Sequence, residues 1–194
     1  MTSRDEILAA VKQNQPELID LPALDLFFET ENPSDIASFS KVLEAIGGKA
    51  YEVNDYSEII AQIKYDFLLE GKRVVSDLPE FSAIAKPYTG TDNHELADVE
   101  LMILPAHFAV AENGACWISS ELFADPIMPF IPQHLILIVK KENVVATMNQ
   151  AYALIATKDY AYAAFIAGPS KTADIEQSLV LGAHGPKSMK VFFV

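Results

Sequence analysis

The stretch that decides the fold is His134-Leu135-Ile136-Leu137-Ile138-Val139, which is apolar throughout after its first residue. A continuous apolar run of this length is typical of a strand that is buried on both faces. A strand with one face in water would instead alternate apolar and polar residues. The run therefore predicts a fully buried strand.

The segments on either side of this run alternate between strand and helix patterns. Apolar segments predict strands at residues 50–53, 73–76, 115–118, 162–167 and 190–194. Apolar residues at helical spacing predict helices near residues 3–11, 36–46, 59–68, 144–155 and 175–179. Strands separated by helices indicate an α/β fold with an open, mostly parallel sheet and helices on both faces.

Local signals mark where two of these helices begin and end. Ser3 to Glu6 has the spacing of a capping box. Asn32-Pro33 can supply a cap and a first-turn proline for the next helix, and Gly47-Gly48 ends it. Residues 13–22 are polar and contain proline, which is typical of a linker. We expect a helical arm and linker at residues 1–22, able to pack on a partner, and a single domain at residues 23–194.

The charge of the chain limits its partners. The 194 residues include 14 Lys and Arg against 27 Asp and Glu, a net charge of −13. This charge repels phosphate backbones and anionic lipids, so we expect no nucleic-acid binding and no membrane-surface binding. Residues 1–100 carry 20 acidic and 8 basic side chains, whereas residues 101–194 carry 7 and 6. The nearly neutral second half can therefore still bind a small anion.

Cysteine and histidine usage argues against disulfides and metals. The single Cys116 cannot form an internal disulfide or supply the thiolates of an iron–sulfur cluster. The four histidines share no metal-ligand spacing, so we expect no metal or cofactor in this chain. The first residues lack the plan of a signal peptide, and no apolar run reaches the ~20 residues that span a bilayer. We expect a cytoplasmic protein without membrane insertion.

The most informative functional motif is Gly168-Pro169-Ser170-Lys171-Thr172-Ala173-Asp174-Ile175-Glu176, where a predicted strand gives way to a predicted helix. Backbone N–H groups at a helix start, the hydroxyls of Ser170 and Thr172 and the charge of Lys171 suit a phosphate or a carboxylate. The motif is not a Walker A loop, because its Gly–Lys spacing is too short. The simpler alternative is that Ser170 or Thr172 only caps the helix.

Two other segments offer groups for proton transfer. Glu112 precedes Asn113-Gly114 in a predicted turn, where partial burial would make it a general acid or base. The alternative is an acidic turn residue in water. His184 lies in a Gly-rich segment, residues 181–186, and can titrate near neutral pH. For His134, at the start of the buried run, a structural role is the simpler interpretation.

Five blocks resemble, in order and spacing, the LUD-domain family of lactate utilization protein C. They are Ala97-Asp98-Val99, Phe108-Ala109-Val110-Ala111-Glu112-Asn113-Gly114, Pro132-Gln133-His134, the Gly168 to Glu176 motif, and Leu181-Gly182-Ala183-His184-Gly185-Pro186. The resemblance implies a Rossmann-like sheet similar to that of the glucosamine-phosphate deaminase, ribose-phosphate isomerase and CoA-transferase group. It also implies a part in the oxidation of L-lactate to pyruvate beside iron–sulfur partner proteins, which would hold the clusters.

From these motifs we hypothesise a pocket where the glutamate turn, the Gly168 to Glu176 motif and the His184 loop meet. Glu112 and His184 would transfer protons, and Asp174 and Glu176 would orient Lys171 or its loop. The remaining residues would bind a small anionic metabolite: Asn113, Gly114, Gly168, Pro169, Ser170, Lys171, Thr172 and Gly185.

Departures from the family pattern leave other functions open. Before the glutamate block, the family usually has a Gly-rich segment, whereas this chain has residues 100–107, which contain no glycine. Asn113 and Ala115 stand where the family has residues with hydroxyl groups. One alternative is a stand-alone isomerase or CoA-transferase-type enzyme that acts on a phosphosugar or an acyl-CoA. Another is a non-catalytic scaffold or metabolite-sensing subunit. Fold analogy does not choose among the three, nor does the sequence fix the oligomeric state.

Overall fold

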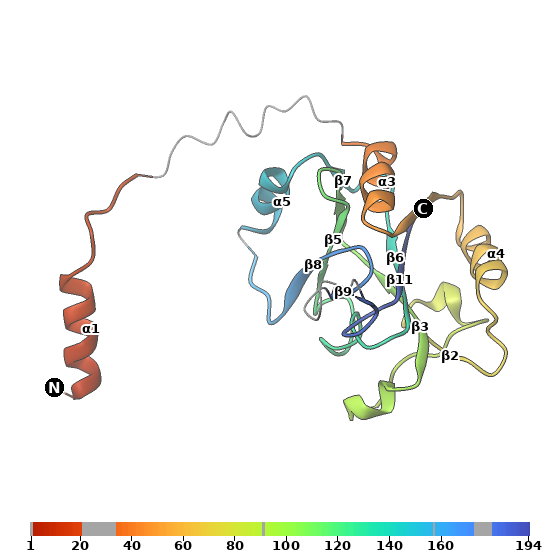
Figure 1. The fold of residues 1–194 in the computed structure, drawn as a ribbon, viewed down its shortest axis with the longest axis horizontal. Coiled ribbons are helices and arrows are strands. Elements are labelled where there is room, and N and C mark those ends of the chain that lie inside the picture. Colours follow the sequence, from red (N-terminus) through yellow and green to blue (C-terminus); the bar gives the residue numbers. More distant parts are fainter. Residues whose placement is uncertain (1, 21–33, 91, 157, 173–179) are drawn as a thin grey trace.

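The computed structural model describes residues 2–20, 34–90, 92–156, 158–172 and 180–194. Its main sheet has five strands in the order β1-β11-β6-β3-β2, and all neighbours are parallel (Figure 1). The strands are β1 (Lys49–Glu52), β2 (Arg73–Val75), β3 (Val99–Pro105), β6 (His134–Val139) and β11 (Ser188–Phe193). The predicted parallel sheet is thus confirmed.

The run that begins at His134 is β6, the middle strand of this sheet. Leu137 lies opposite Val191 of β11 on one side and Leu104 of β3 on the other. All residues of β6 after His134 are buried. The prediction of a fully buried strand is confirmed, because strands flank β6 on both sides and other elements cover both of its faces.

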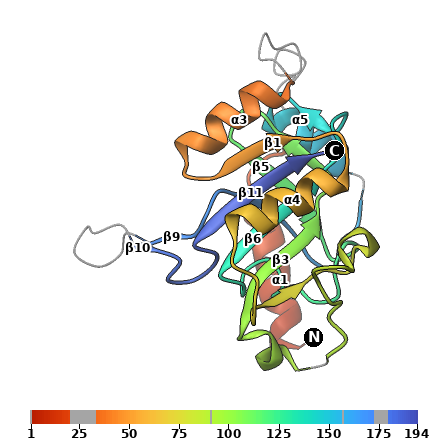
Figure 2. The ribbon, with the colours of Figure 1, turned by 90° about the vertical axis from the view of Figure 1, so that its right-hand side faces the viewer.

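Two helices cover opposite faces of the sheet, as predicted. The helix α4 (Tyr56–Asp66) packs Ile59 and Ile63 on one face, together with Phe81 of the short helix η1 (Pro79–Phe81). Figure 2 shows α4 in front of β11 and β6. The helix α3 (Ile36–Ala45) packs Phe39 and Leu43 on the other face. Each strand therefore sends alternate residues into two separate hydrophobic clusters.

A second sheet packs on the α3 face and was not predicted from the sequence. Its order is β7-β4-β5-β8, with β4 and β7 parallel and the other pairs antiparallel. The strands are β4 (Phe108–Val110), β5 (Ala115–Ser119), β7 (Val144–Val145) and β8 (Ala163–Ala167). Ala109, Cys116 and Ile118 join the core on the α3 side of the main sheet. Because the sequence analysis predicted only one sheet, it missed this second layer.

The predicted helix at residues 144–155 is wrong at its start. Val144 and Val145 form β7 by pairing with β4, and the helix α5 (Met148–Ile155) begins only afterwards. The side chain of Thr147 caps α5 by accepting a hydrogen bond from the Gln150 N–H. Pairing between strands thus overrode the local helical spacing of the two valines.

Two predicted helix caps are shifted. The helix α1 (Ser3–Gln13) has its capping box at Thr2 and Asp5, one residue before the predicted one. The helix α3 is capped by Asp35, whose carboxylate accepts a hydrogen bond from the Ser38 N–H at 2.6 Å. The predicted Asn32-Pro33 cap lies outside the described residues. Helix α1 buries none of its side chains and lies apart from the sheets (Figure 1).

The C-terminal part differs from the predicted helix start after Gly168. Lys171–Thr172 form β9, which pairs antiparallel with β10 (Val180–Leu181). The predicted helix at residues 175–179 lies outside the described residues. In the part of the chain that is described, no helix is long and apolar enough to cross a membrane.

Candidate functional site

The Gly168–Thr172 segment lies beside the end of α3. Gly168 has a φ of +73°, and a Cβ atom at this position would lie 3.1 Å from the backbone oxygen of Ile46. Both the backbone conformation and the close contact favour glycine. Ser170 donates its N–H to the backbone oxygen of Pro186 at 2.9 Å, just before β11 begins. The segment thus sits at the amino-terminal ends of the parallel strands.

Lys171 is exposed and lies next to the carboxyl end of α3. A Cβ atom at Gly47, just after that helix, would be 3.7 Å from Lys171 Nζ. A cation there is favoured by the negative end of the helix dipole, although the carbonyls of Val42, Leu43 and Glu44 already accept backbone hydrogen bonds. The ammonium group can therefore stabilise the end of α3, and because it is exposed, a dissolved ligand can also reach it.

The predicted anion site at a helix N-terminus is not built as expected. The Ser170 N–H is already bonded to Pro186, and Gly182 donates its N–H to the Ser170 oxygen at 3.1 Å. Lys171 and Thr172 lie in a strand pair. An anion here would be held by side chains rather than by a row of free N–H groups. Asp174 and Glu176 lie outside the described residues.

Glu112 lies at the start of α5 as well as near α3. Its Oε2 accepts a hydrogen bond from the Met148 N–H at 2.7 Å, which satisfies one of the free donors at the start of α5. Glu112 is exposed and lines a pocket of about 420 Å³ with Ser38 and Lys41 of α3. The turn after it approaches α3 closely, since a Cβ atom at Gly114 would be 3.1 Å from the Leu43 nitrogen.

The turn also holds Asn113 in a structural bond. Its side-chain Oδ1 accepts a hydrogen bond from the Ala115 N–H at 3.1 Å, across Gly114 with its φ of +67°. This contact stabilises the turn and occupies the amide oxygen. Asn113 thus has a structural explanation in addition to its predicted part in binding.

His184 lies on the other side of the Gly168–Thr172 segment. It is exposed and lines a pocket of about 380 Å³ with Phe130 and Gln133. A Cβ atom at Gly185 would be 3.1 Å from Ser170 Cβ, so the two loops are in contact. Pro169, between Gly168 and Ser170, is buried.

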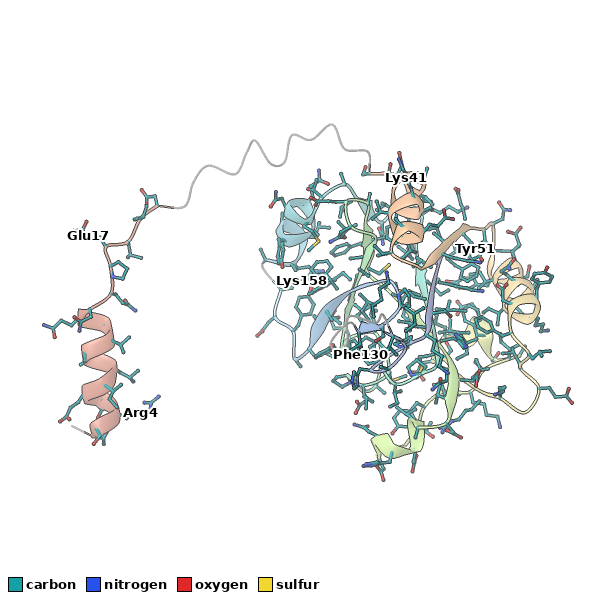
Figure 3. The ribbon with its side chains drawn as sticks, viewed as in Figure 1. Arg4, Glu17, Lys41, Tyr51, Phe130 and Lys158 are labelled. Atoms are coloured by element: carbon teal, nitrogen blue, oxygen red, sulfur yellow. The ribbon has the colours of Figure 1, made fainter. Side chains whose placement is uncertain are left out.

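The structure thus brings the predicted loops together only in part. The Gly168–Thr172 segment contacts the His184 loop directly. This segment and the Glu112 turn do not need to touch, because both pack against the carboxyl-terminal part of α3. Glu112 and His184 themselves line two separate pockets. Figure 3 marks this separation with Lys41 from the first pocket and Phe130 from the second. The catalytic roles of both residues remain predictions.

The amino-terminal strand ends also carry a polar network around His134. Its Nδ1 lies 2.7 Å from Ser188 Oγ, and its Nε2 lies 3.8 Å from Glu100 Oε1. Lys72 bonds the other oxygen of Glu100 at 3.1 Å. The interpretation of His134 as a hydrogen-bonded structural histidine agrees with these contacts. Cys116 is fully buried, and burial raises the pKa of its thiol well above the ordinary range, which keeps it protonated.

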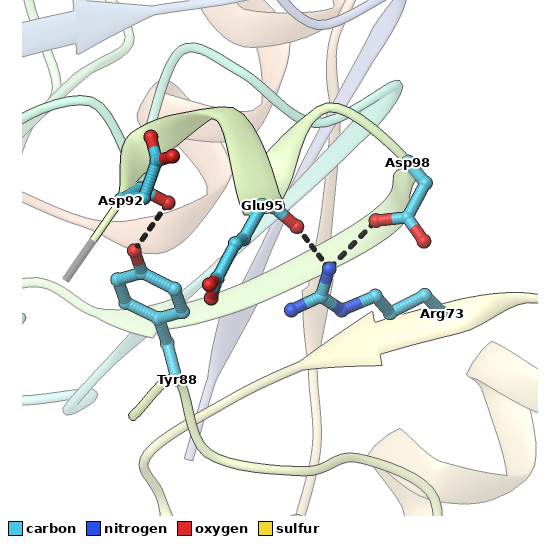
Figure 4. Close-up of polar contacts among 5 residues, drawn as sticks. All are labelled: Arg73, Tyr88, Asp92, Glu95 and Asp98. Atoms are coloured by element: carbon cyan, nitrogen blue, oxygen red, sulfur yellow. Dashed lines mark hydrogen bonds and ion pairs between the residues drawn. The ribbon is translucent and has the colours of Figure 1, made fainter. Parts of the chain in front are cut away.

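Part of the first family block has a structural explanation. Arg73 of β2 donates from Nη1 to Asp98 Oδ1 at 2.7 Å and to the backbone oxygen of Glu95 (Figure 4). Nearby, the Tyr88 hydroxyl donates to the backbone oxygen of Asp92 at 3.0 Å. These bonds fasten the short helix η2 (Asn93–Leu96) to the edge of the sheet. Asp98 therefore has a structural contact, an exposed ion pair with Arg73, that accounts for it without a ligand.

The carboxyl-terminal strand ends form a region that sequence reasoning did not treat as a site. A pocket of about 340 Å³ lies there, lined by residues that follow β3 and β6, including His107, Lys140 and Asn143. Nothing in the local sequence marks these residues, because only the strand order places them together. Among the described residues, no group of three or more His, Cys, Asp and Glu is arranged to hold a metal ion.

The two partly buried histidines make stability depend on pH. Burial lowers the pKa of both His107 and His134 below the ordinary 6.5, although Glu121 and Glu100 act in the opposite direction. As the pH falls below 6.5, the unfolded chain therefore takes up protons first, and stability declines until the folded histidines are protonated too. We expect urea titrations to show a falling free energy of unfolding between about pH 7 and pH 5.

A double variant isolates this effect. In His107→Gln with His134→Asn, each amide can replace a ring nitrogen but does not titrate, so stability should be flat across that interval. His94→Gln, at an exposed position, is the control and should keep the decline. An unchanged decline in the double variant would assign the effect to other groups.

Together, these features define an α/β domain with a Rossmann-like parallel sheet and loops gathered around the end of one covering helix. The family model named LUD domain matches residues 66–194. The chain therefore belongs to the LUD domain family.

Several relatives and one solved structure are similar to this chain. Lactate utilization protein C of Bacillus pumilus (strain SAFR-032) is 38% identical over 85 residues, covering 41% of this chain and 35% of that protein. Lactate utilization protein C of Geobacillus kaustophilus (strain HTA426) is 34% identical over 118 residues, covering 57% and 48%. The chain thus spans less than half the length of these relatives. A DUF162 family protein from Deinococcus radiodurans matches with a TM-score of 0.59 at 16% identity, over 82% of this chain and 95% of that one, and supports the fold alone.

Proposed function

We propose that this chain takes part in lactate utilization by binding a small carboxylate metabolite beside Lys171. The names of its relatives support the process. The observation that carries the binding proposal is the position of Lys171, an exposed cation in a segment that contacts two other family blocks through α3 and Gly185. Because the second half of the chain has a net charge of only −1, an anion can approach it.

The side chains of the segment supply the groups for carboxylate binding. The Lys171 ammonium provides a charge-assisted hydrogen bond, and the hydroxyls of Ser170 and Thr172 are further donors. His184 and Glu112 are the proposed groups for proton transfer, one on each side of the segment. Asp174 and Glu176 are the proposed positioning residues for Lys171.

The proposed reaction requires electron acceptors outside this chain. Conversion of L-lactate to pyruvate releases two electrons and two protons. We assign the electrons to iron–sulfur clusters in partner proteins, since the single Cys116 of this chain cannot ligate a cluster by itself. The protons are assigned to His184, Glu112 and water.

Replacing Lys171 with alanine tests the site. We expect the affinity for L-lactate or pyruvate to fall by about 1.5–3 kcal/mol, as is typical when a charge-assisted hydrogen bond is lost. Calorimetric titration of the full chain measures this change. Lys64→Ala, an exposed lysine on α4, is the matched control and should bind as the wild type does. Equal affinities in all three proteins would remove Lys171 from the site.

A second candidate function is that of a non-catalytic scaffold. It is favoured by α1, which exposes Ile7, Leu8 and Val11 on a helix with no buried residue. Figure 3 shows the side chains of α1 clear of the sheets. This function predicts that removing residues 1–20 abolishes capture of the iron–sulfur partners, whereas Lys171→Ala leaves it intact.

A further inference from the structure

The pocket at the carboxyl-terminal strand ends has the position of a ligand site. It is lined by Pro105 and Ala106 at the end of β3, by Ile138 and Lys140 at the end of β6, and by Leu122. Open parallel sheets bind ligands in the crevice at the carboxyl ends of their strands. The Lys171 segment lies at the opposite ends of these strands, so the two regions are distinct.

The lining of this pocket combines apolar walls with positive charge. Leu78, Leu122 and Ile138 supply the walls, while Lys140 and His107 supply nitrogen groups. Among the described residues, no Asp or Glu side chain lines the pocket, and the nearest carboxylate to His107 is that of Glu121, with Oε2 4.0 Å from His107 Nε2. An anion with an apolar body therefore matches this lining better than a cation or a sugar does.

Hydrogen bonds fix the polar groups of the pocket relative to one another. His107 donates its backbone N–H to the Trp117 oxygen at 2.9 Å, and its Nε2 lies 2.8 Å from Ser119 Oγ. Asn143 donates from Nδ2 to the His107 oxygen at 3.0 Å and from its N–H to the Lys140 oxygen at 2.9 Å. The pocket is thus preorganised, which reduces the entropy cost of binding.

An unpartnered donor lies close to the same residues. A neighbouring pocket of about 480 Å³ shares His107 and Asn143 with the first, and Trp117 lines it. Trp117 is only 7% exposed, and among the described residues its buried Nε1 has no hydrogen-bond partner. A buried N–H without an acceptor is costly, so an acceptor from a ligand or from water would be favoured there.

We propose that the pocket at the carboxyl-terminal strand ends binds a small monocarboxylate with an aliphatic body. Its carboxylate lies at Lys140 and His107, and its hydrocarbon part lies against Leu78, Leu122 and Ile138. A volume of about 340 Å³ accommodates a chain of several carbons. This site goes beyond the proposed lactate site, and its ligand is distinguished from lactate by its apolar length.

Hexanoate is the probe, titrated by calorimetry into the full chain. We expect saturable binding, and affinity that rises by about fourfold for each CH₂ group from butanoate to hexanoate. Hexanol, which lacks the charge, should bind at least about tenfold more weakly. Equal binding of hexanol and hexanoate would overturn the proposal, as would no binding of hexanoate.

Adjacent lysines provide the matched variants. Lys140→Ala should weaken hexanoate binding by about tenfold or more, and Lys140→Arg should largely restore it. Lys141→Ala removes the same charge, but Lys141 points to Glu52 at 3.5 Å and does not line the pocket, so it should leave binding unchanged. Equal losses in Lys140→Ala and Lys141→Ala would contradict the site.

The single tryptophan gives a second readout that needs no variant. Trp117 lines the neighbouring pocket, so hexanoate should change its fluorescence with the same midpoint as the calorimetric titration. Lys171→Ala should leave this change intact, which separates failure of this proposal from failure of the proposed lactate site. Loss of the Trp117 fluorescence change in Lys171→Ala would contradict the proposal that the two sites are distinct.

Discussion

Leu137→Ala is expected to lower the free energy of unfolding by about 3–5 kcal/mol, the largest effect of any variant considered for this chain. Leu137 is 0% exposed in the middle strand β6 and is flanked by Leu104 and Val191 on the neighbouring strands. Strands on both sides limit how far the backbone can move to fill the cavity, so little of the loss is recovered. Urea unfolding of both proteins measures the difference.

Leu68→Ala is the matched control for this prediction. Leu68 is 92% exposed just after α4, so the same chemical change should alter stability by less than about 0.5 kcal/mol. A loss of under about 1 kcal/mol for Leu137→Ala would mean that β6 is not the closely packed centre of the fold.

Asp66→Asn is expected to cost about 2 kcal/mol, less than for a fully buried ion pair, because Lys190 is buried but Asp66 is partly exposed. Lys190 of β11 is buried, and its Nζ lies 2.5 Å from Asp66 Oδ2, with the two side chains 11% and 19% exposed. Burial alone would raise the pKa of Asp66, yet hydrogen bonds from Lys190 and Gln62 hold it below the ordinary value. The variant leaves the ammonium group of Lys190 without a countercharge.

A double variant separates charge from packing at this position. Adding Lys190→Met to Asp66→Asn removes the unpaired charge but keeps a chain of similar length beside Phe67, so most of the lost stability should return. Glu52→Gln breaks the more exposed pair with Lys141 and should cost under about 1 kcal/mol. The charge explanation would be contradicted if the double variant were as unstable as Asp66→Asn.

The sequence predicted four strands of the main sheet, β1, β2, β6 and β11, but not β3. The clearest signal was the continuous apolar run of residues 134–139, which burial on both faces produces. The turn at Gly47, with its φ of +92°, was predicted for a similar local reason. The second sheet could not be predicted in this way. Its strand β7 has only two residues, and they are strand only because β4 lies beside them.

The candidate site was predictable to a smaller extent. Family blocks indicated which loops to compare, and Gly168 and Gly185 do lie against neighbouring segments. Local sequence predicted a helix start within the Gly168 to Glu176 motif, whereas Lys171 and Thr172 form a strand by pairing with β10. The separation of Glu112 from His184, and the grouping of His107 with Lys140, depend on the strand order, which a single sequence does not contain.

The measurement that tests the central claim most directly is an amide chemical-shift map of the full chain, labelled with nitrogen-15 and titrated with L-lactate. The proposed function predicts that the largest saturable shifts occur at residues 168–172, with further shifts at Gly47 and Gly185, which lie against this segment. Shifts confined to His107, Lys140 and Asn143, or no saturable shifts at all, would contradict carboxylate binding beside Lys171.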